Sequence, residues 1–336
     1  MIEVPSRNPR IKVAGASLAT FALTLALARR QTSVDAPTAD EPVLATLDGL
    51  DAERVTLTTD DGAAIEVVVA GADGGTTVVL SHCWMGVHTM WAAVAHSLVA
   101  DGYRVVLYDQ RGHGASTVGS DLLTTDRLGS DLLAVLDSVG ATDAVLVGHS
   151  MGGMAIQGLV ATHPEVLGRI RGLVLVATAA RFSRLTIPRR LAHRIIGDAA
   201  STRLAARSPG RVRRAFGPGA GPAHFQVLHD SIVATPGSTR ADCLVAISAM
   251  EYRDRLGQVS VPTRVVVGSH DRFTTPARSR ALTDLISGAE MTFLDGIGHM
   301  VPLEAPEAVV AAVAAVTAVD RTPKPTASPR LTGAAT

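Results

Sequence analysis

A glycine-flanked serine between a buried strand and a helix is the feature that most constrains this fold. Ser150 stands in Gly-His-Ser-Met-Gly-Gly, directly after the apolar run 144–147 and before a helix-compatible stretch at 154–162. Small neighbours allow a sharp strand-to-helix turn, which lifts the serine hydroxyl clear of the end of a sheet. The pattern predicts a nucleophile elbow with Ser150 as the nucleophile.

Two later segments supply a carboxylate and an imidazole. A Val-rich run ends in Gly268-Ser269-His270-Asp271, and the next predicted strand, 291–295, is followed by a glycine-rich loop that carries His299. A serine hydroxyl needs a base, and the base needs a group that orients it. We therefore expect His299 to accept the Ser150 proton and Asp271 to hold His299 in the right tautomer.

These assignments have structural alternatives. His299 could be an ordinary loop histidine, and Asp271 could cap the helix that begins near Pro276. Asp295 is the competing carboxylate, and we interpret it as a turn residue.

From about Glu53 to Val316 the chain resembles the alpha/beta-hydrolase family. Four blocks carry the resemblance: Ser81-His82-Cys83-Trp84, Asp109-Gln110-Arg111-Gly112-His113-Gly114, the elbow around Ser150, and Gly268 to Asp271 with Pro276 and Gly298-His299. The family places its nucleophile, acid and base in this order along the chain. The resemblance also implies that the backbone N–H groups of Met151 and Trp84 form the oxyanion hole.

The distribution of apolar runs outside these blocks predicts an α/β fold. A hairpin is expected at 54–59 and 64–70, and the later short Val/Leu runs that do not alternate are typical of parallel strands covered on both faces. We expect a mostly parallel central sheet with helices on both faces, built from 51–178 and 259–320. Residues 179–258 show no convincing strand and are broken by prolines, and by resemblance they form an inserted helical cap.

Residues near the predicted oxyanion hole are assigned to the substrate pocket. They are Cys83, Met85 and His149, with core packing as their alternative role. Cys83 stands where the family pattern has glycine, so its side chain is expected either to restrict the loop or to narrow the acyl pocket. A buried core cysteine explains it better than a catalytic thiol, because no base is assigned to it. His149 and His113 also suit structural roles, and His82 is expected to brace its loop.

The N-terminus predicts export or membrane anchoring. Residues 13–28 carry no charge and are flanked by basic residues, which resembles a signal or anchor segment at 1–30. As a helix this stretch would cover about 24 Å, which is short of the roughly 30 Å hydrocarbon core. The expected location is the cell envelope, and the alternative is an ordinary N-terminal helix on a cytoplasmic protein. Residues 31–50 read as a linker and 321–336 as a disordered tail.

The first half of the cap is strongly basic. Residues 181–214 contain ten arginines and one acidic residue, and Leu185, Leu191, Ile195 and Ala199 recur among them at near-helical spacing. A basic amphipathic helix would suit an anionic membrane surface. The arginines expected to make that contact are Arg181, Arg184, Arg189, Arg190 and Arg194. The alternative is that acidic residues elsewhere on the fold balance them.

The function expected from the resemblance is hydrolysis of carboxylic esters, esterase- or lipase-like, through an acyl-Ser150 intermediate. The substrate would be a small-molecule acyl ester or a lipid, with no cofactor and no metal. A formal net charge of zero gives no sign of nucleic-acid binding. Other chemistry on the same triad stays open, namely that of a thioesterase, a carbon–carbon bond hydrolase or a cofactor-free perhydrolase. A ligand-binding protein without turnover is the alternative from another class.

Overall fold

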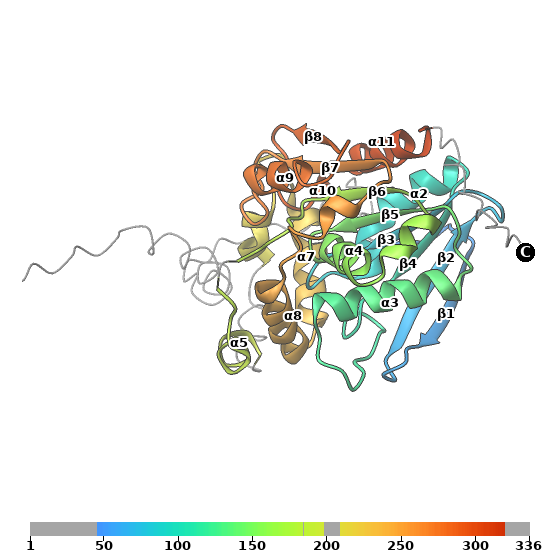
Figure 1. Ribbon diagram of the computed structural model, residues 1–336. Helices are drawn as coiled ribbons and strands as arrows, with labels where there is room; N and C mark the ends of the chain where they lie inside the picture. The colour runs from blue at the N-terminus through green and yellow to red at the C-terminus, as the bar shows by residue number, and fades with distance from the viewer. Residues whose placement is uncertain (1–45, 184, 198–208, 320–336) are drawn as a thin grey trace, which may run out of the picture.

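The computed structural model describes residues 46–183, 185–197 and 209–319 (Figure 1). The expected signal or anchor at 1–30, most of the linker and the tail at 321–336 lie outside these residues. Across the described ranges, none of the helices combines the length and the apolar character needed to cross a membrane.

A single sheet of eight strands organises the described part of the chain. Its spatial order is β1-β2-β4-β3-β5-β6-β7-β8. The first two strands form the expected hairpin, β2 pairs antiparallel with β4, and every later pairing is parallel. The strands are β1 (Ala52–Thr58), β2 (Ala64–Gly71), β3 (Thr77–Ser81), β4 (Arg104–Tyr108), β5 (Ala144–His149), β6 (Ile170–Val176), β7 (Thr263–Gly268) and β8 (Glu290–Leu294).

Burial along the strands explains why their sequences look as they do. All residues of the central strands β3 and β5 are buried, as a sheet covered on both faces requires. The edge strands β1 and β8 are largely exposed, and Phe293 on β8 is 52% exposed. The uninterrupted Val/Leu runs therefore mark the middle of the sheet.

Helices cover both faces of the sheet, so the predicted fold class is confirmed. Residues of α3 and α4 pack with one set of inward strand side chains, and residues of α2 and α11 pack with the other set (Figure 1). These four helices are α2 (Ala92–Ala100), α3 (Thr125–Ser138), α4 (Met151–Thr162) and α11 (Pro306–Thr317). Two shorter helices, α9 (Pro276–Thr283) and α10 (Val301–Glu304), and the 3-10 turns η2 (His88–Trp91) and η3 (Pro164–Arg169) also contribute buried residues to the core.

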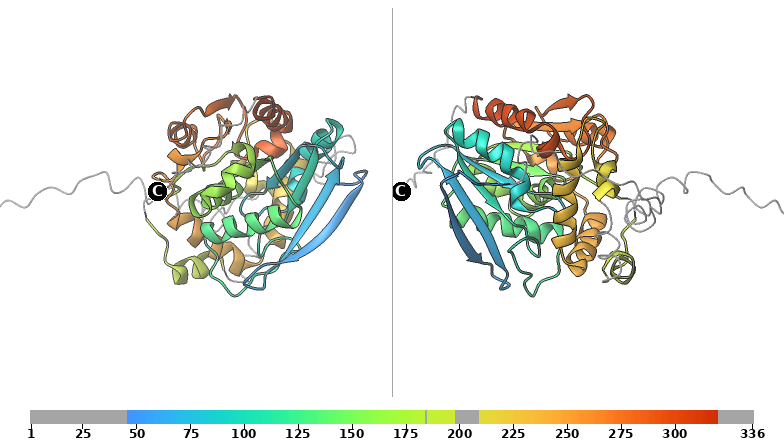
Figure 2. Two further views of the ribbon diagram at one scale, coloured as in Figure 1. Left: turned by 45° about the vertical axis from the view of Figure 1, so that its right-hand side comes forward. Right: turned by 180° about the vertical axis from the view of Figure 1, so that it is seen from behind.

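The insertion at 179–258, called the cap below, is helical in its described part. It contains α5 (Arg189–Ile196), η4 (Pro209–Ala215), α7 (Pro222–Ala234), α8 (Gly237–Ala249) and η5 (Leu256–Gln258), and no strand lies in the described residues of this range. Both views in Figure 2 place these helices together at one end of the sheet. The prolines that obscured the helices in the sequence stand at their starts, because Pro222 opens α7 and Pro236 directly precedes α8.

The basic helix of the cap differs from its prediction. In α5 the buried residues are Ala192 and Ile196, whereas Leu191 is 47% exposed and Leu185, before the helix, is 63% exposed. Of the expected apolar stripe only Ile195 packs partly against the core, and the stripe was wrong for Leu185 and Leu191. Ala192 and Ile196, four residues apart, form the buried stripe. Ala199 and Arg184 lie outside the described residues.

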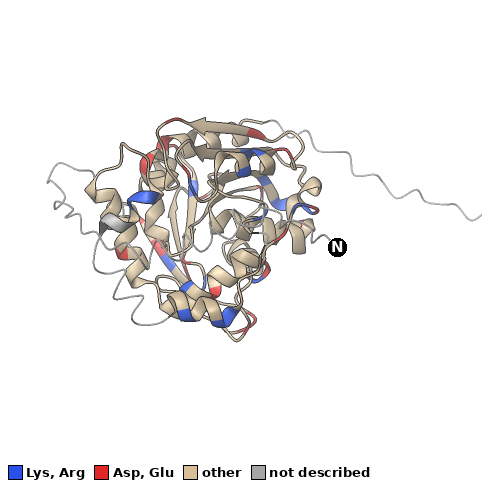
Figure 3. Cartoon of the chain, turned by 90° about the vertical axis from the view of Figure 1, so that its left-hand side faces the viewer, with Lys and Arg blue, Asp and Glu red and all other residues tan. Residues whose placement is uncertain are grey.

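Acidic residues of the fold balance two of the cap arginines. Arg189 Nε lies 2.7 Å from Asp242 Oδ1 on α8, and Arg181 Nε lies 3.2 Å from Glu251 Oε2. Arg190 and Arg194 are exposed. Figure 3 shows basic and acidic segments interspersed over the described part of the face in view. This arrangement favours the balanced interpretation over a continuous membrane-binding surface.

Candidate active site

Ser150 occupies a strained turn between β5 and α4. Its backbone has φ 53° and ψ −111°, a conformation that residues with a side chain rarely adopt. Its N–H donates to Val176 O at 2.9 Å, and Thr178 Oγ1 donates to its carbonyl oxygen at 2.8 Å. A Cβ on Gly152 would lie 2.1 Å from Ser81 O, so the turn requires glycine there. This is the geometry expected of a nucleophile elbow.

Asp271 and His299 meet although 28 residues separate them in the chain. Asp271 follows β7, His299 follows β8, and His299 Nδ1 lies 2.8 Å from Asp271 Oδ2. Burial alone would raise the pKa of Asp271, but attraction to His299 and hydrogen bonds from neighbouring donors outweigh it and lower the pKa. Asp271 therefore stays ionised beside the imidazole. Asp295, the competing carboxylate, is exposed.

Asp271 also organises its own turn. Its Oδ1 accepts the backbone N–H of Phe273 at 2.8 Å and of Thr274 at 2.9 Å. Thr275, not Asp271, holds the N-cap position of α9. The carboxylate is thus fixed by its own loop, with Oδ2 facing the imidazole.

Thr274 is a member of this cluster that the sequence analysis missed. Its side chain is fully buried, and its Oγ1 lies 2.7 Å from Asp271 Oδ2, 2.7 Å from Ala177 O and 3.2 Å from His299 Nδ1. The hydroxyl links the end of β6 to the carboxylate. Thr274 follows the acid by three residues and belongs to no sequence motif, so nothing in the sequence identifies it as a site residue.

The loop after β3, residues 81–86, is called the oxyanion loop below. His82 is buried, its Nδ1 donates to Cys83 O at 2.7 Å, and its Nε2 accepts the N–H of Gln110 at 2.9 Å. Burial, with the neighbouring His113 adding to it, lowers the pKa of His82 to about 3, so the ring is neutral and can act as donor and acceptor at once. His82 braces the loop as expected.

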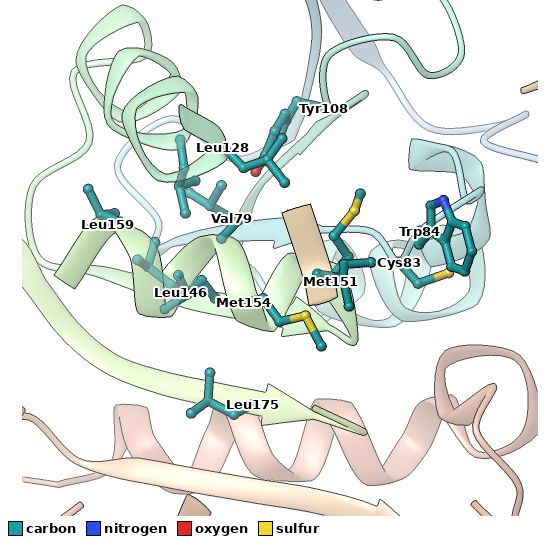
Figure 4. Close-up of a cluster of buried hydrophobic side chains, with 14 of the residues drawn as sticks. Val79, Cys83, Trp84, Tyr108, Leu128, Leu146, Met151, Met154, Leu159 and Leu175 are labelled. Atoms are coloured by element: carbon teal, nitrogen blue, oxygen red, sulfur yellow. The ribbon is translucent and has the colours of Figure 1, made fainter. Parts of the chain in front are cut away.

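Two further contacts hold the oxyanion loop. The N–H of Met85 donates to His113 Nε2 at 3.3 Å, and the carbonyl oxygen of Met85 accepts from Ser231 Oγ of α7 at 2.6 Å. Figure 4 shows Trp84 and Cys83 beside the end of α4 where Met151 lies. Met151 is the first residue of α4, where helical N–H groups lack acceptors inside the helix.

Cys83 is a buried thiol. It is 3% exposed, and its Sγ lies 4.0 Å from Met90 Sδ. Burial raises the pKa of Cys83 to about 12, so the thiol is protonated near neutral pH. This supports the interpretation of Cys83 as a packing residue.

His149 does not line the cavity, although it was assigned to the pocket. It is 1% exposed, and its Nε2 donates to His299 O at 2.8 Å. Burial, with the neighbouring His299 adding to it, lowers the pKa of His149 to about 3. A neutral His149 therefore supports the backbone of the residue proposed as the base.

Ser150 and His299 open onto the same apolar cavity of about 90 Å³. Cys83, Trp84 and Met85 line it from the oxyanion loop, whereas Met151 does not. The cap supplies much of the remaining wall. The other lining residues are Met154, Phe182, Val212, Arg214, Ala215, Leu228, Ile232, Ile247, Phe273 and Met300.

Comparison with known proteins agrees with this arrangement. Residues 76–306 match the model of the family described as alpha/beta hydrolase fold. The chain is 30% identical over 223 residues to 3-oxoadipate enol-lactonase 2 of Acinetobacter baylyi. The matched region covers 64% of this chain and 79% of that protein. It is 27% identical to a non-heme chloroperoxidase of Streptomyces lividans, over 73% of this chain and 92% of that protein.

Solved structures agree as well. The crystal structure of the enol-lactonase from Burkholderia xenovorans is 27% identical, with a TM-score of 0.68 over 78% of this chain and 99% of that chain. The order of the strands, the turn at Ser150 and the match to the family model agree with one another. The chain belongs to the alpha/beta hydrolase fold family.

Proposed function

We propose that this protein is a serine hydrolase that cleaves carboxylic esters of small molecules through an acyl-Ser150 intermediate. The observation that carries the proposal is that His299, held by Asp271 at 2.8 Å, lines the same cavity as Ser150. The base, the group that orients it and the strained nucleophile are then parts of one site.

The proposed reaction has two halves. Ser150 Oγ attacks the ester carbonyl carbon while His299 Nε2 takes the hydroxyl proton, and the resulting oxyanion is stabilised by the N–H groups of Met151 and Trp84. The tetrahedral intermediate collapses, His299 returns the proton to the leaving alkoxide, and the alcohol departs. Water, deprotonated by His299, then attacks the acyl-enzyme, and the second tetrahedral intermediate collapses as His299 returns the proton to Ser150 Oγ, which releases the carboxylic acid and regenerates the serine hydroxyl. Asp271 stays ionised and stabilises the imidazolium in both halves.

The cavity supports a short, apolar acyl group. Its volume of about 90 Å³ is small, and Cys83, Met85 and Ile232 contribute apolar wall. We propose esters with short acyl chains as the preferred substrates, because a short apolar group fits within this space. The enol-lactonase relatives support cyclic esters as a second form of the same substrate class.

Three measurements test the proposal. Steady-state hydrolysis of p-nitrophenyl esters from acetate to octanoate should give multiple turnovers with a preference for short chains. A γ-lactone panel tests the cyclic form. A fluorophosphonate probe should label Ser150, as located by peptide mass spectrometry.

The control is Ser150→Ala, which should lose the label and at least about a thousandfold in kcat. Folded wild-type protein that neither reacts with the probe nor turns over any ester would contradict the proposal. A single slow turnover with retained ligand would instead indicate a binding protein.

A further inference from the structure

The loop that carries His299, residues 296–300 and called the base loop below, is bonded directly to the cap. The backbone N–H of His299 donates to Ala215 O at 2.7 Å, and that of Met300 donates to the same oxygen at 3.2 Å. Ala215 ends η4, so a cap carbonyl fixes the backbone of the residue proposed as the base.

The side chain of Glu304 makes a second connection between the base loop and the cap. Its Oε2 accepts the N–H of Gly217, in the cap, at 2.6 Å. The N–H of Gly298, in the base loop, lies 3.1 Å from both carboxylate oxygens. One carboxylate thus accepts hydrogen bonds from two segments more than eighty residues apart in the sequence. Backbone N–H groups are neutral donors, so the carboxylate serves here as an acceptor and not as half of an ion pair.

The two segments also approach backbone to backbone. A Cβ on Gly217 would lie 1.8 Å from Gly296 O, and a Cβ on Gly298 would lie 2.4 Å from the carbonyl carbon of Phe216. No side chain fits at either glycine without moving one segment away from the other. The contact therefore exists only while the cap is seated on the base loop.

The cap segment in this contact also forms part of the cavity wall. Val212, Arg214 and Ala215 line the cavity, and Ala215 is the residue whose oxygen accepts from the base loop. A shift of this segment would change the cavity and the position of His299 together.

We propose that Glu304 is a positioning residue: by joining Gly217 of the cap to Gly298 of the base loop, it fixes His299 relative to Ser150. The inference rests on the proposed function for its catalytic consequence. The contact of Glu304 with Gly217 and Gly298, called the joint below, depends only on hydrogen bonds that the structure shows. The joint and the proposed function can therefore be tested separately.

The first experiment compares Glu304→Gln with Glu307→Gln, an exposed glutamate three residues further on. A glutamine oxygen in the place of Oε2 still accepts from Gly217, but the NH₂ group then stands where Oε1 lies, 3.1 Å from the nitrogen of Gly298. A donor there faces the N–H donor of Gly298, so the contact of residue 304 with the base loop is weakened. We expect Glu304→Gln to lower kcat for the best p-nitrophenyl ester by about ten- to hundredfold, because a displaced base is poorly aligned, with KM changed by less than about threefold. Glu307→Gln should match wild type.

The second experiment displaces the cap segment directly. Gly217→Ala should lower kcat in the same way, whereas Gly219→Ala, which has no atom within 4 Å of its Cβ position, should not. If both changes break one joint, the double variant Gly217→Ala/Glu304→Gln should lose little more than either single variant. Losses that multiply would show that the two residues act independently and would overturn the proposal.

Hydrogen exchange supplies a readout that does not need activity. In Glu304→Gln the amides of residues 298–300 and 217 should exchange faster, while those of β5 keep their protection. Unchanged exchange and unchanged kcat in an active enzyme would overturn the inference. Inactive wild-type protein with the expected exchange pattern would instead refute the proposed function and leave the joint intact. If Glu304→Gln does not fold, the comparison of Gly217→Ala with Gly219→Ala decides.

Discussion

Ser231 on α7 donates a 2.6 Å hydrogen bond to the backbone oxygen of Met85 in the oxyanion loop. Met85 in turn donates its N–H to His113 Nε2 on the other side of the loop. Met85, the residue after Trp84, is therefore held through both its backbone groups, one by a cap helix and one by the turn after β4. Both halves of the proposed machinery, the oxyanion loop and the base loop, thus contact the cap.

Replacing Ser231 with alanine tests whether the cap helps to hold the oxyanion loop. One hydrogen bond of this kind is worth about 1 kcal/mol, so kcat/KM for p-nitrophenyl esters should fall roughly fivefold. The control is Ser97→Ala, which removes a serine hydrogen bond to Ala93 O within α2. An equal loss in both variants would mean that the effect is on overall stability and not on the loop.

Thr274→Val should weaken catalysis without unfolding the protein. The substitution keeps the shape of the side chain but removes the hydroxyl between Asp271, Ala177 O and His299. We expect kcat to fall about tenfold, because the Asp271 carboxylate loses a hydrogen-bond donor and the His299 ring loses its contact with the hydroxyl. Thr274→Ser should recover most of the activity. Thr283→Val, on α9 outside the cluster, is the control, and wild-type kinetics in Thr274→Val would refute a role for the hydroxyl.

Cys83 should resist alkylation in the folded protein. Because burial raises its pKa to about 12, almost no thiolate exists at pH 8, and iodoacetamide should modify it only after denaturation. Peptide mass spectrometry before and after adding denaturant checks this. Cys83→Ala should keep ester turnover and accept slightly longer acyl chains, since it removes wall from the cavity. Loss of all activity in Cys83→Ala would contradict the assignment as a packing residue.

Asp109 should make stability depend on pH in the acid range. Burial alone would raise its pKa, but hydrogen bonds from the ring and the N–H of His88 outweigh this and lower the pKa to about 2. A carboxyl with a depressed folded-state pKa stabilises the protein above its unfolded value of 3.8, and this contribution disappears as the pH falls through 2. Asp109→Asn should therefore unfold about 2 kcal/mol more easily at pH 7 and show a flatter loss of stability between pH 4 and 2.

Urea unfolding at several pH values measures that difference. The control is Asp73→Asn, an exposed aspartate in the turn before β3, which should behave as wild type. An unchanged acid slope in Asp109→Asn would show that other carboxylates dominate acid unfolding.

The sequence was sufficient to predict the sheet, the elbow and the meeting of Asp271 with His299. Short Val/Leu runs can be recognised because burial on both faces leaves no room for polar residues. The acid and base could be chosen because each follows a parallel strand, and the carboxyl ends of such strands meet at one edge of the sheet. Spacing along the chain carried this information.

Thr274, Ser231 and Glu304 could not be predicted in the same way. Each acts through a contact with a segment that is distant in the chain or has no periodic pattern, such as the contact of Glu304 with Gly217. The buried stripe of α5 was also misjudged, because hydrophobic spacing alone does not say where α8 will lie. These features depend on how the cap seats on the core.

The tight approach of Gly217 to the base loop has a consequence for protein engineering. Exchanging the insertion for that of a homologue, in order to obtain new selectivity, would place a foreign main chain against Gly296 and Gly298. A graft that lacks glycine at position 217, or a recipient that lacks glutamate at 304, would lose one of the contacts that hold the base loop against the cap. Chimeras should therefore transfer residues 215–217 and position 304 as one unit.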